Sequence, residues 1–257
     1  MFIFVLKLVL TPILITGATL AGRRWGPSVS GWLVGLPLTS GPVSFFLALQ
    51  QGNVFAAHAA LGTLTGLVSV AFYCLTYSWL SLRFHWPLCW FSSWGMFFLS
   101  TFVLEQLHLP LLLAFLIVVV ALSLTFIFWP QQEAKSNDAN TPAWDLPLRI
   151  VIATAFVLLL TGIAPLLGPL LSGLLTPLPI LSTILAVFAH RLYGASPARH
   201  VLRGVIIGVF AFAIFFLIIA ALLPVVSITL TFVCAIAAAL CTQGLSLVLI
   251  RRRIIRI

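Results

Sequence analysis

Long apolar runs follow one another along almost the whole chain, separated by short polar interruptions. Each run is about 20 residues long and apolar on all sides, as a helix that crosses a hydrocarbon core of roughly 30 Å must be. The pattern therefore predicts an all-α polytopic membrane protein with nine spans, at residues 2–21, 27–49, 54–80, 86–106, 109–129, 146–166, 169–189, 198–223 and 224–250.

One stretch of this pattern occurs twice, at residues 26–40 and 168–182. Composition alone predicts about one or two identities between two stretches of this length. At a constant offset of 142 the sequence instead has identical residues at Gly26, Pro27, Ser30, Gly31, Leu33, Leu36, Pro37 and Ser40. Further matches at the same offset continue through residue 66, so the chain contains an internal repeat.

A single polar segment of any length, residues 131–145 (QQEAKSNDANTPAWD), lies between the two copies. It contains a proline and most of the acidic residues of the chain, which is typical of a loop. The predicted organisation is a first four-helix repeat (1–107), a linker helix (108–130), a cytoplasmic loop (131–145) and a second four-helix repeat with a basic C-terminal tail (146–257).

The composition excludes a water-soluble surface. Of the 257 residues, 62% are hydrophobic and 7% are charged, whereas a soluble domain has about 25% charged residues. The net charge of +9 does not indicate nucleic-acid binding, because the cations lie in short loops and at the C-terminus rather than in long basic arms. The four cysteines lie in apolar spans without CxxC spacing, as small buried hydrophobes do. The predicted partner is the lipid bilayer, and no oligomeric state is predicted.

The distribution of positive charge predicts the orientation of the chain. If the N-terminus is outside, every Lys and Arg except Lys7 falls in a cytoplasmic segment, as the positive-inside rule requires. The predicted external loops, near residues 51, 108, 165 and 223, contain none. The sequence therefore predicts a multi-pass protein of the bacterial inner membrane with an external N-terminus and a cytoplasmic C-terminus.

The repeat and this orientation together predict inverted halves. Spans one to four correspond to spans six to nine, and span five adds a crossing between them, so the halves face opposite ways across the membrane. Inverted repeats recur in secondary transporters, which place the binding site near the midplane at the repeat interface, often on broken helices.

The repeated stretch contains the predicted site. Pro37 and Pro179 lie about ten residues into their spans, near mid-bilayer at 1.5 Å per residue. Each proline releases the carbonyl four residues earlier, at Leu33 and Leu175. Non-helical backbone at this depth must be buried or must line a wet cavity. The predicted substrate-binding residues are Pro37, Thr39, Ser40, Pro179, Ser182 and Thr183.

A structural interpretation of the same stretch stays open. In it, the two helices are kinked by proline, their hydroxyls satisfy the released carbonyls, and small residues allow close helix packing. The residues assigned to this helix break and packing are Ser30, Gly31, Ser172 and Gly173.

His58 and His200 form another matched pair. They are either proton-responsive gates, since imidazole titrates near physiological pH, or interfacial histidines near helix starts, which we favour. Arg199 and Arg203 either extend to the lipid headgroups, which we favour, or draw an anionic substrate inward. Small-residue ladders that we interpret as packing seams lie at Gly62, Gly66, Gly204 and Gly208.

No pattern of residues indicates catalysis. HExxH, GxSxG, Walker and paired-carboxylate motifs are all missing from the sequence. Glu105 is the single acid that falls within a predicted span, and it lies near the outer end without a counterpart in the second half. The sequence therefore predicts no enzyme, no cofactor and no metal site.

Residues 26–66 and 168–208 share the pattern G-x-L-x-x-L-P-x-x-S, followed by a small polar turn with glycine and a further apolar span. This pattern resembles the GlpM-like family of small four-span membrane proteins of unknown function. The resemblance covers each half separately and implies a fused, inverted pair of such units. It implies no activity.

These observations predict an integral membrane transporter of a small molecule or ion that uses alternating access between two inverted repeats. A neutral, anionic or amphipathic substrate fits the shortage of acidic residues better than a metal cation does. The alternatives are a non-transporting membrane scaffold or assembly protein and an intramembrane lipid-modifying enzyme.

Overall fold

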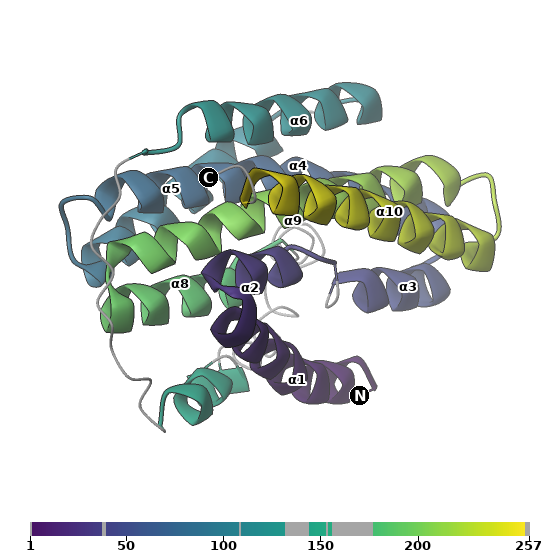
Figure 1. The fold of residues 1–257 in the computed structure, drawn as a ribbon. Coiled ribbons are helices and arrows are strands. Elements are labelled where there is room, and N and C mark those ends of the chain that lie inside the picture. Colours follow the sequence, from purple (N-terminus) through teal and green to yellow (C-terminus); the bar gives the residue numbers. More distant parts are fainter. Residues whose placement is uncertain are drawn as a thin grey trace.

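The computed structural model describes residues 2–37, 40–107, 109–131, 144–152, 154–155 and 177–254 (Figure 1). Every regular element in this part of the chain is a helix, which confirms the predicted all-α class. Residues 145–152 form a short helix. The other helices are α1 (Phe2–Trp25), α2 (Pro27–Val34), α3 (Ser40–Gln51), α4 (Asn53–Leu80), α5 (Trp86–Glu105), α6 (Leu111–Ile127), α8 (Ile180–Tyr193), α9 (Ala195–Leu222) and α10 (Ile228–Ile254).

Four of these helices are long and apolar enough to cross a membrane. They are α4, α9 and most of α5 and α10, over Trp86–Leu104 and Ile228–Ser246. Helices α6 and α8 are apolar but shorter. These lengths and compositions are those of a multi-pass helical membrane protein.

Predicted spans and observed helices differ where the backbone breaks. The span predicted at 27–49 is two helices, because α2 ends at Val34 and α3 begins at Ser40. The span predicted at 169–189 corresponds to α8, and its first half lies outside the described residues. Most of the span predicted at 146–166 lies outside them too.

Helices α4 and α9 form the centre of the bundle and run antiparallel. Thr183 of α8 donates a hydrogen bond to the Tyr73 hydroxyl of α4 at 2.9 Å, and His190 Nδ1, further along α8, lies 3.2 Å from the Tyr77 hydroxyl, further along α4. The two contacts follow the same order on both helices, so α4 and α8 are parallel. The chain reverses at Gly194 between α8 and α9, and α9 is therefore antiparallel to α4. Fully buried side chains of this pair are Leu64, Tyr73, Tyr77, Leu202, Ile206 and Phe216.

Helices α5, α6 and α10 lie outside this central pair and carry large exposed apolar side chains. Such a surface is costly in water and suits contact with lipid. Its members include Phe91, Phe98, Phe102, Leu112, Leu116, Val120, Val233, Ile236 and Leu240.

Helix α2 packs against α9 at backbone distance, through glycines on both helices. A methyl group built on Gly35 would lie 2.5 Å from the Cα of Gly208. A methyl group on Gly208 would lie 2.6 Å from the Trp32 carbonyl oxygen. Gly31 and Gly204 make similarly close contacts with the backbone of the facing helix. Small residues allow this approach, which is typical of helix pairs in membranes.

The described arginines gather at one end of the bundle. This end contains the C-termini of α1, α4 and α8 and the N-termini of α2 and α9, whose connections lie together (Figure 1). The α9–α10 connection lies at the opposite end (Figure 1). The arginines at this end whose side chains the structure describes are Arg23, Arg24, Arg83, Arg149, Arg191, Arg199 and Arg203.

Candidate functional site

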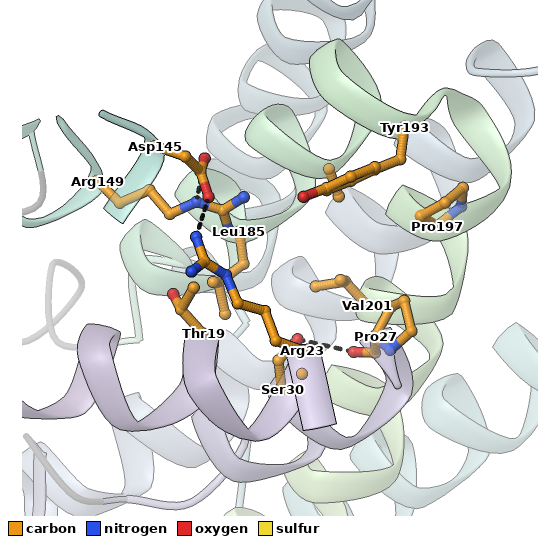
Figure 2. Close-up of a pocket in the computed structure, with 12 residues that line it drawn as sticks. Thr19, Arg23, Pro27, Ser30, Asp145, Arg149, Leu185, Tyr193, Pro197 and Val201 are labelled. Carbon is orange, nitrogen blue, oxygen red and sulfur yellow. Dashed lines mark hydrogen bonds and ion pairs between the residues drawn. The ribbon is translucent and has the colours of Figure 1, made fainter. Parts of the chain in front are cut away.

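A cavity of about 370 Å³ lies between α1, α2, α8, α9 and the short helix 145–152, at the arginine-rich end of the bundle (Figure 2). Helices α1 and α2 come from the first half of the chain, and the other three come from the second half. The cavity is lined by Thr19, Gly22, Arg23, Pro27, Ser30, Asp145, Arg149, Leu185, Ala189, Tyr193, Pro197 and Val201.

The cavity wall contains one network of three charged side chains. Arg23 Nη2 donates to Asp145 Oδ2 at 3.0 Å, and Arg149 Nε donates to Asp145 Oδ1 at 2.8 Å. Asp145 is fully buried and Arg149 is 5% exposed, whereas the Arg23 side chain is 37% exposed. Two guanidinium groups face one carboxylate, so the network carries a net positive charge.

Local structure positions this network. Asp145 and Arg149 are four residues apart on one helix, a spacing that brings side chains together on the same face. The Arg149 guanidinium also lies 4.9 Å from the centre of the Phe188 ring of α8, within the range of a cation–π contact. Arg149 is therefore held from two sides.

Two aliphatic hydroxyl groups of the lining, on Ser30 and Thr19, differ in their hydrogen bonding. Ser30 donates to the Pro27 carbonyl at 2.7 Å, within the first turn of α2. Thr19 is 4% exposed, and its buried Oγ1 atom has no hydrogen-bond partner among the residues that the structure describes. Because an unpartnered buried polar atom costs about 1–3 kcal/mol, Thr19 offers a group that a bound ligand can satisfy.

The opposite side of the cavity is mostly apolar. In Figure 2 the charged network lies on one side, Pro197 and Val201 lie on the other, and the Tyr193 hydroxyl points from that side toward the network. Leu185 and Ala189 of α8 add buried apolar surface. A polar group at one side and an apolar body at the other is the usual composition of a small-molecule pocket.

The predicted helix break is present in the first half. Helix α2 ends before Pro37, and the Leu33 carbonyl accepts a hydrogen bond from the Leu36 amide at 3.2 Å. Pro37 cannot donate to this carbonyl, and the tightened last turn of α2 supplies the Leu36 amide by i, i+3 bonding instead. Pro37 is buried, and its own carbonyl accepts from the Gly41 amide at 2.8 Å.

The other predicted substrate-binding residues lie at the start of α3 and α8. Ser40 and Ser182 are buried, and Ser182 donates to the Pro179 carbonyl at 3.0 Å. Thr183 donates to Tyr73, as described above. Thr39, Ser172 and Gly173 lie outside the described residues. Ser30, assigned to the break, instead lines the cavity.

The predicted pair His58 and His200 lies at opposite ends of the bundle, because each is near the N-terminus of one of two antiparallel helices. Both side chains are exposed. His200 Nδ1 donates to the Ser196 carbonyl at 2.8 Å, a contact within its own helix. Neither histidine lines the cavity.

Sequence reasoning did not identify the charged network as a site. From the sequence, Arg23 and Arg149 were counted among the cytoplasmic cations, and Asp145 was assigned to the loop at residues 131–145. The Asp145–Arg149 spacing of four residues was a detectable signal. The pairing of Asp145 with Arg23, 122 residues away, had no signal in a single sequence.

Fold and cavity together define a class: a multi-pass helical membrane protein with a cationic cavity between its two halves. No protein-family model, curated protein or solved structure matches the chain.

Proposed function

We propose that the chain is an integral membrane transporter of a small molecule or ion, working by alternating access between two inverted repeats. One observation carries this proposal. The cavity is walled by α1 and α2 from the first half and by residues 145–152, α8 and α9 from the second. In transporters built from inverted repeats, the interface between the repeats is where the substrate binds.

The helix boundaries support the repeat. At the offset of 142 residues, α4 (Asn53–Leu80) corresponds to α9 (Ala195–Leu222) at both ends. The starts of α5 and α10, at Trp86 and Ile228, correspond as well. The turns that precede α4 and α9 agree in conformation, because Gly52 and Gly194 have φ angles of 85° and 93°. These positive values favour glycine over any other residue.

Contacts at the breaks support it further. The Gly41 amide donates to the Pro37 carbonyl, and its counterpart, the Thr183 amide, donates to the Pro179 carbonyl, both at 2.8 Å. Gly35 contacts Gly208. The counterparts of these two positions in the opposite halves are Pro177 and Gly66, and they are in contact as well. A methyl group on Gly66 would lie 2.6 Å from Cγ of Pro177. A two-fold relation between the halves predicts reciprocal contacts of this kind.

The antiparallel course of α4 and α9 supports the inversion, since matched helices of inverted repeats cross the membrane in opposite directions. The arginines that gather at one end support a cytoplasmic assignment for that end. We therefore infer an external N-terminus, a cytoplasmic C-terminus and a cavity that opens on the cytoplasmic side.

The cavity and the break lie at successive depths along α2. Ser30 lines the cavity, and the helix ends about 6 Å further along its axis, at 1.5 Å per residue. We infer that the structure is an inward-facing state, in which the break separates the cavity from the outside. The packed surface between α2 and α9 is the one over which the halves would move.

Solute uptake into liposomes containing the purified protein tests this proposal. Pro37→Ala restores an amide donor at the break between α2 and α3, and Pro179→Ala restores one at the matching position before α8. We expect each to lower initial uptake about tenfold, the effect of roughly 1.4 kcal/mol on the conformational equilibrium. Pro110→Ala is the matched control, because Pro110 precedes α6, in the segment that links the halves.

Folded protein that transports no solute from a broad panel would contradict the proposal and favour the scaffold alternative. Chemical conversion of added lipid would favour the lipid-modifying enzyme. The resemblance of each half to the GlpM-like family stays a proposal as well, and it is independent of the transport assay.

A further inference from the structure

The charged groups that line the cavity disfavour a cationic ligand. Asp145 is the one carboxylate among the described residues of its lining, and both of its oxygens accept hydrogen bonds from arginines. A fully buried carboxylate that already has two charge-assisted bonds has little capacity left for an incoming cation. The surrounding field is also positive, so a cationic ligand is disfavoured.

The same network retains donors for an anion. A guanidinium group has five N–H donors, and Arg23 and Arg149 each spend one of them on Asp145. Thr19, beside the Arg23 guanidinium in Figure 2, has a buried hydroxyl without a partner among the described residues. Three groups with unused donors therefore converge on one side of the cavity.

The size and the far wall of the cavity indicate an organic ligand. A volume of about 370 Å³ lies within the range of roughly 300–1,000 Å³ that small-molecule pockets occupy, and it exceeds the needs of a bare inorganic ion. Leu185, Ala189 and Val201 supply apolar surface to the lining, and Val201 lies on the side away from the network in Figure 2.

We propose that this cavity binds an organic anion, with the carboxylate or phosphate group held by Thr19, Arg23 and Arg149 and an apolar body against α8 and α9. The inference rests on the proposed transport function only in naming this anion as the substrate. The same chemistry is offered by a free metabolite-sized anion and by the headgroup of an anionic lipid.

Calorimetric titration of the full-length protein in phosphatidylcholine nanodiscs tests the binding. Benzoate, benzamide and benzylamine are matched probes that differ in charge, and phenyl phosphate tests the second anionic group. We expect benzoate and phenyl phosphate to bind, and both to bind at least about tenfold more tightly than benzamide or benzylamine, as charge-assisted hydrogen bonds allow.

Three substitutions localise the site. Arg23→Gln and Arg149→Gln are expected to weaken benzoate binding about tenfold, because each removes a charged donor. Thr19→Val is expected to weaken it about threefold, because the hydroxyl donor that it removes carries no charge. Arg24→Gln is the matched control, since Arg24 is the exposed neighbour of Arg23 and lies over the Trp25 ring. Thr19→Val and Arg23→Gln keep the test decisive if Arg149→Gln does not fold.

Benzylamine binding as tight as benzoate, or benzoate affinity unchanged in both Thr19→Val and Arg23→Gln, would overturn the inference. Nanodiscs that also contain phosphatidylglycerol separate the two sources of the anion: competition with benzoate assigns the site to lipid headgroups, and no competition assigns it to free anions. Binding without uptake would overturn transport alone, and uptake without benzoate binding would overturn the anion site alone.

Discussion

Asp145 is a fully buried charged residue. It is the sole described carboxylate among the arginines at its end of the bundle. Its burial is tolerated because two guanidinium groups compensate its charge. The reverse dependence matters equally. Without Asp145, the buried Arg149 has no carboxylate partner within the described part of the chain.

We expect Asp145→Ala to lower the free energy of unfolding by about 3–5 kcal/mol, the usual cost of removing one partner from a buried ion pair. Acetate should restore part of this loss, because it can place a carboxylate beside Arg149. Thermal unfolding of the variant with acetate or with chloride measures both effects. A variant as stable as the wild type, or equal rescue by chloride, would contradict the structural role given to this carboxylate.

At the scale of elements, the contact between α2 and α9 is set by backbone against backbone. No side chain at Gly208 or Gly35 can be accommodated without separating the helices. The side chain of Gln243 in α10 adds a hydrogen bond to the Trp32 carbonyl at 2.9 Å. Trp32 Nε1 in turn donates to Ser246 at 2.9 Å, so α10 fastens α2 from a second direction.

Gly208→Ala should destabilise the protein by about 1–3 kcal/mol, the typical cost of overpacking, because the new methyl group meets the backbone of α2. Gly62→Ala is the matched control, since nothing lies within 4 Å of a methyl group there. Guanidinium or thermal unfolding in detergent compares the two. Equal stability of both variants would show that α2 and α9 are less closely packed than the structure has them.

Helix positions could be predicted from the sequence where local signals, such as an apolar run, a glycine or a proline, determine where a helix begins or ends. The span predicted at 54–80 is α4 (Asn53–Leu80), because its residues are apolar throughout and Gly52, with a positive φ, separates it from the preceding helix. Pro37 indicated a break, and a break is present there. The cavity could not be predicted in this way, because Thr19, Asp145 and Leu185 come together only through packing of helices distant in sequence.

At the scale of the whole molecule, the clustering of arginines at one end predicts the orientation of the chain in the membrane. Reporter fusions measure this orientation. A green fluorescent protein fused to the C-terminus should fluoresce, because it folds in the cytoplasm, and alkaline phosphatase fused within residues 131–145 should be inactive. Alkaline phosphatase fused after residue 51, in the predicted first external loop, should be active and serves as the positive control. Active phosphatase at 131–145 would reverse the assignment of the arginine-rich end and of the cavity to the cytoplasm.

The close contact of α2 with α9 also has a consequence for biosynthesis. Roughly 170 residues of chain separate Gly35 from Gly208, and ribosomes add about 5–20 residues per second. Helix α2 therefore exists for on the order of 10–30 s before its partner does. During that interval its glycine face contacts lipid or the insertion machinery, so survival of the nascent first half depends on how well that face is shielded until α9 arrives.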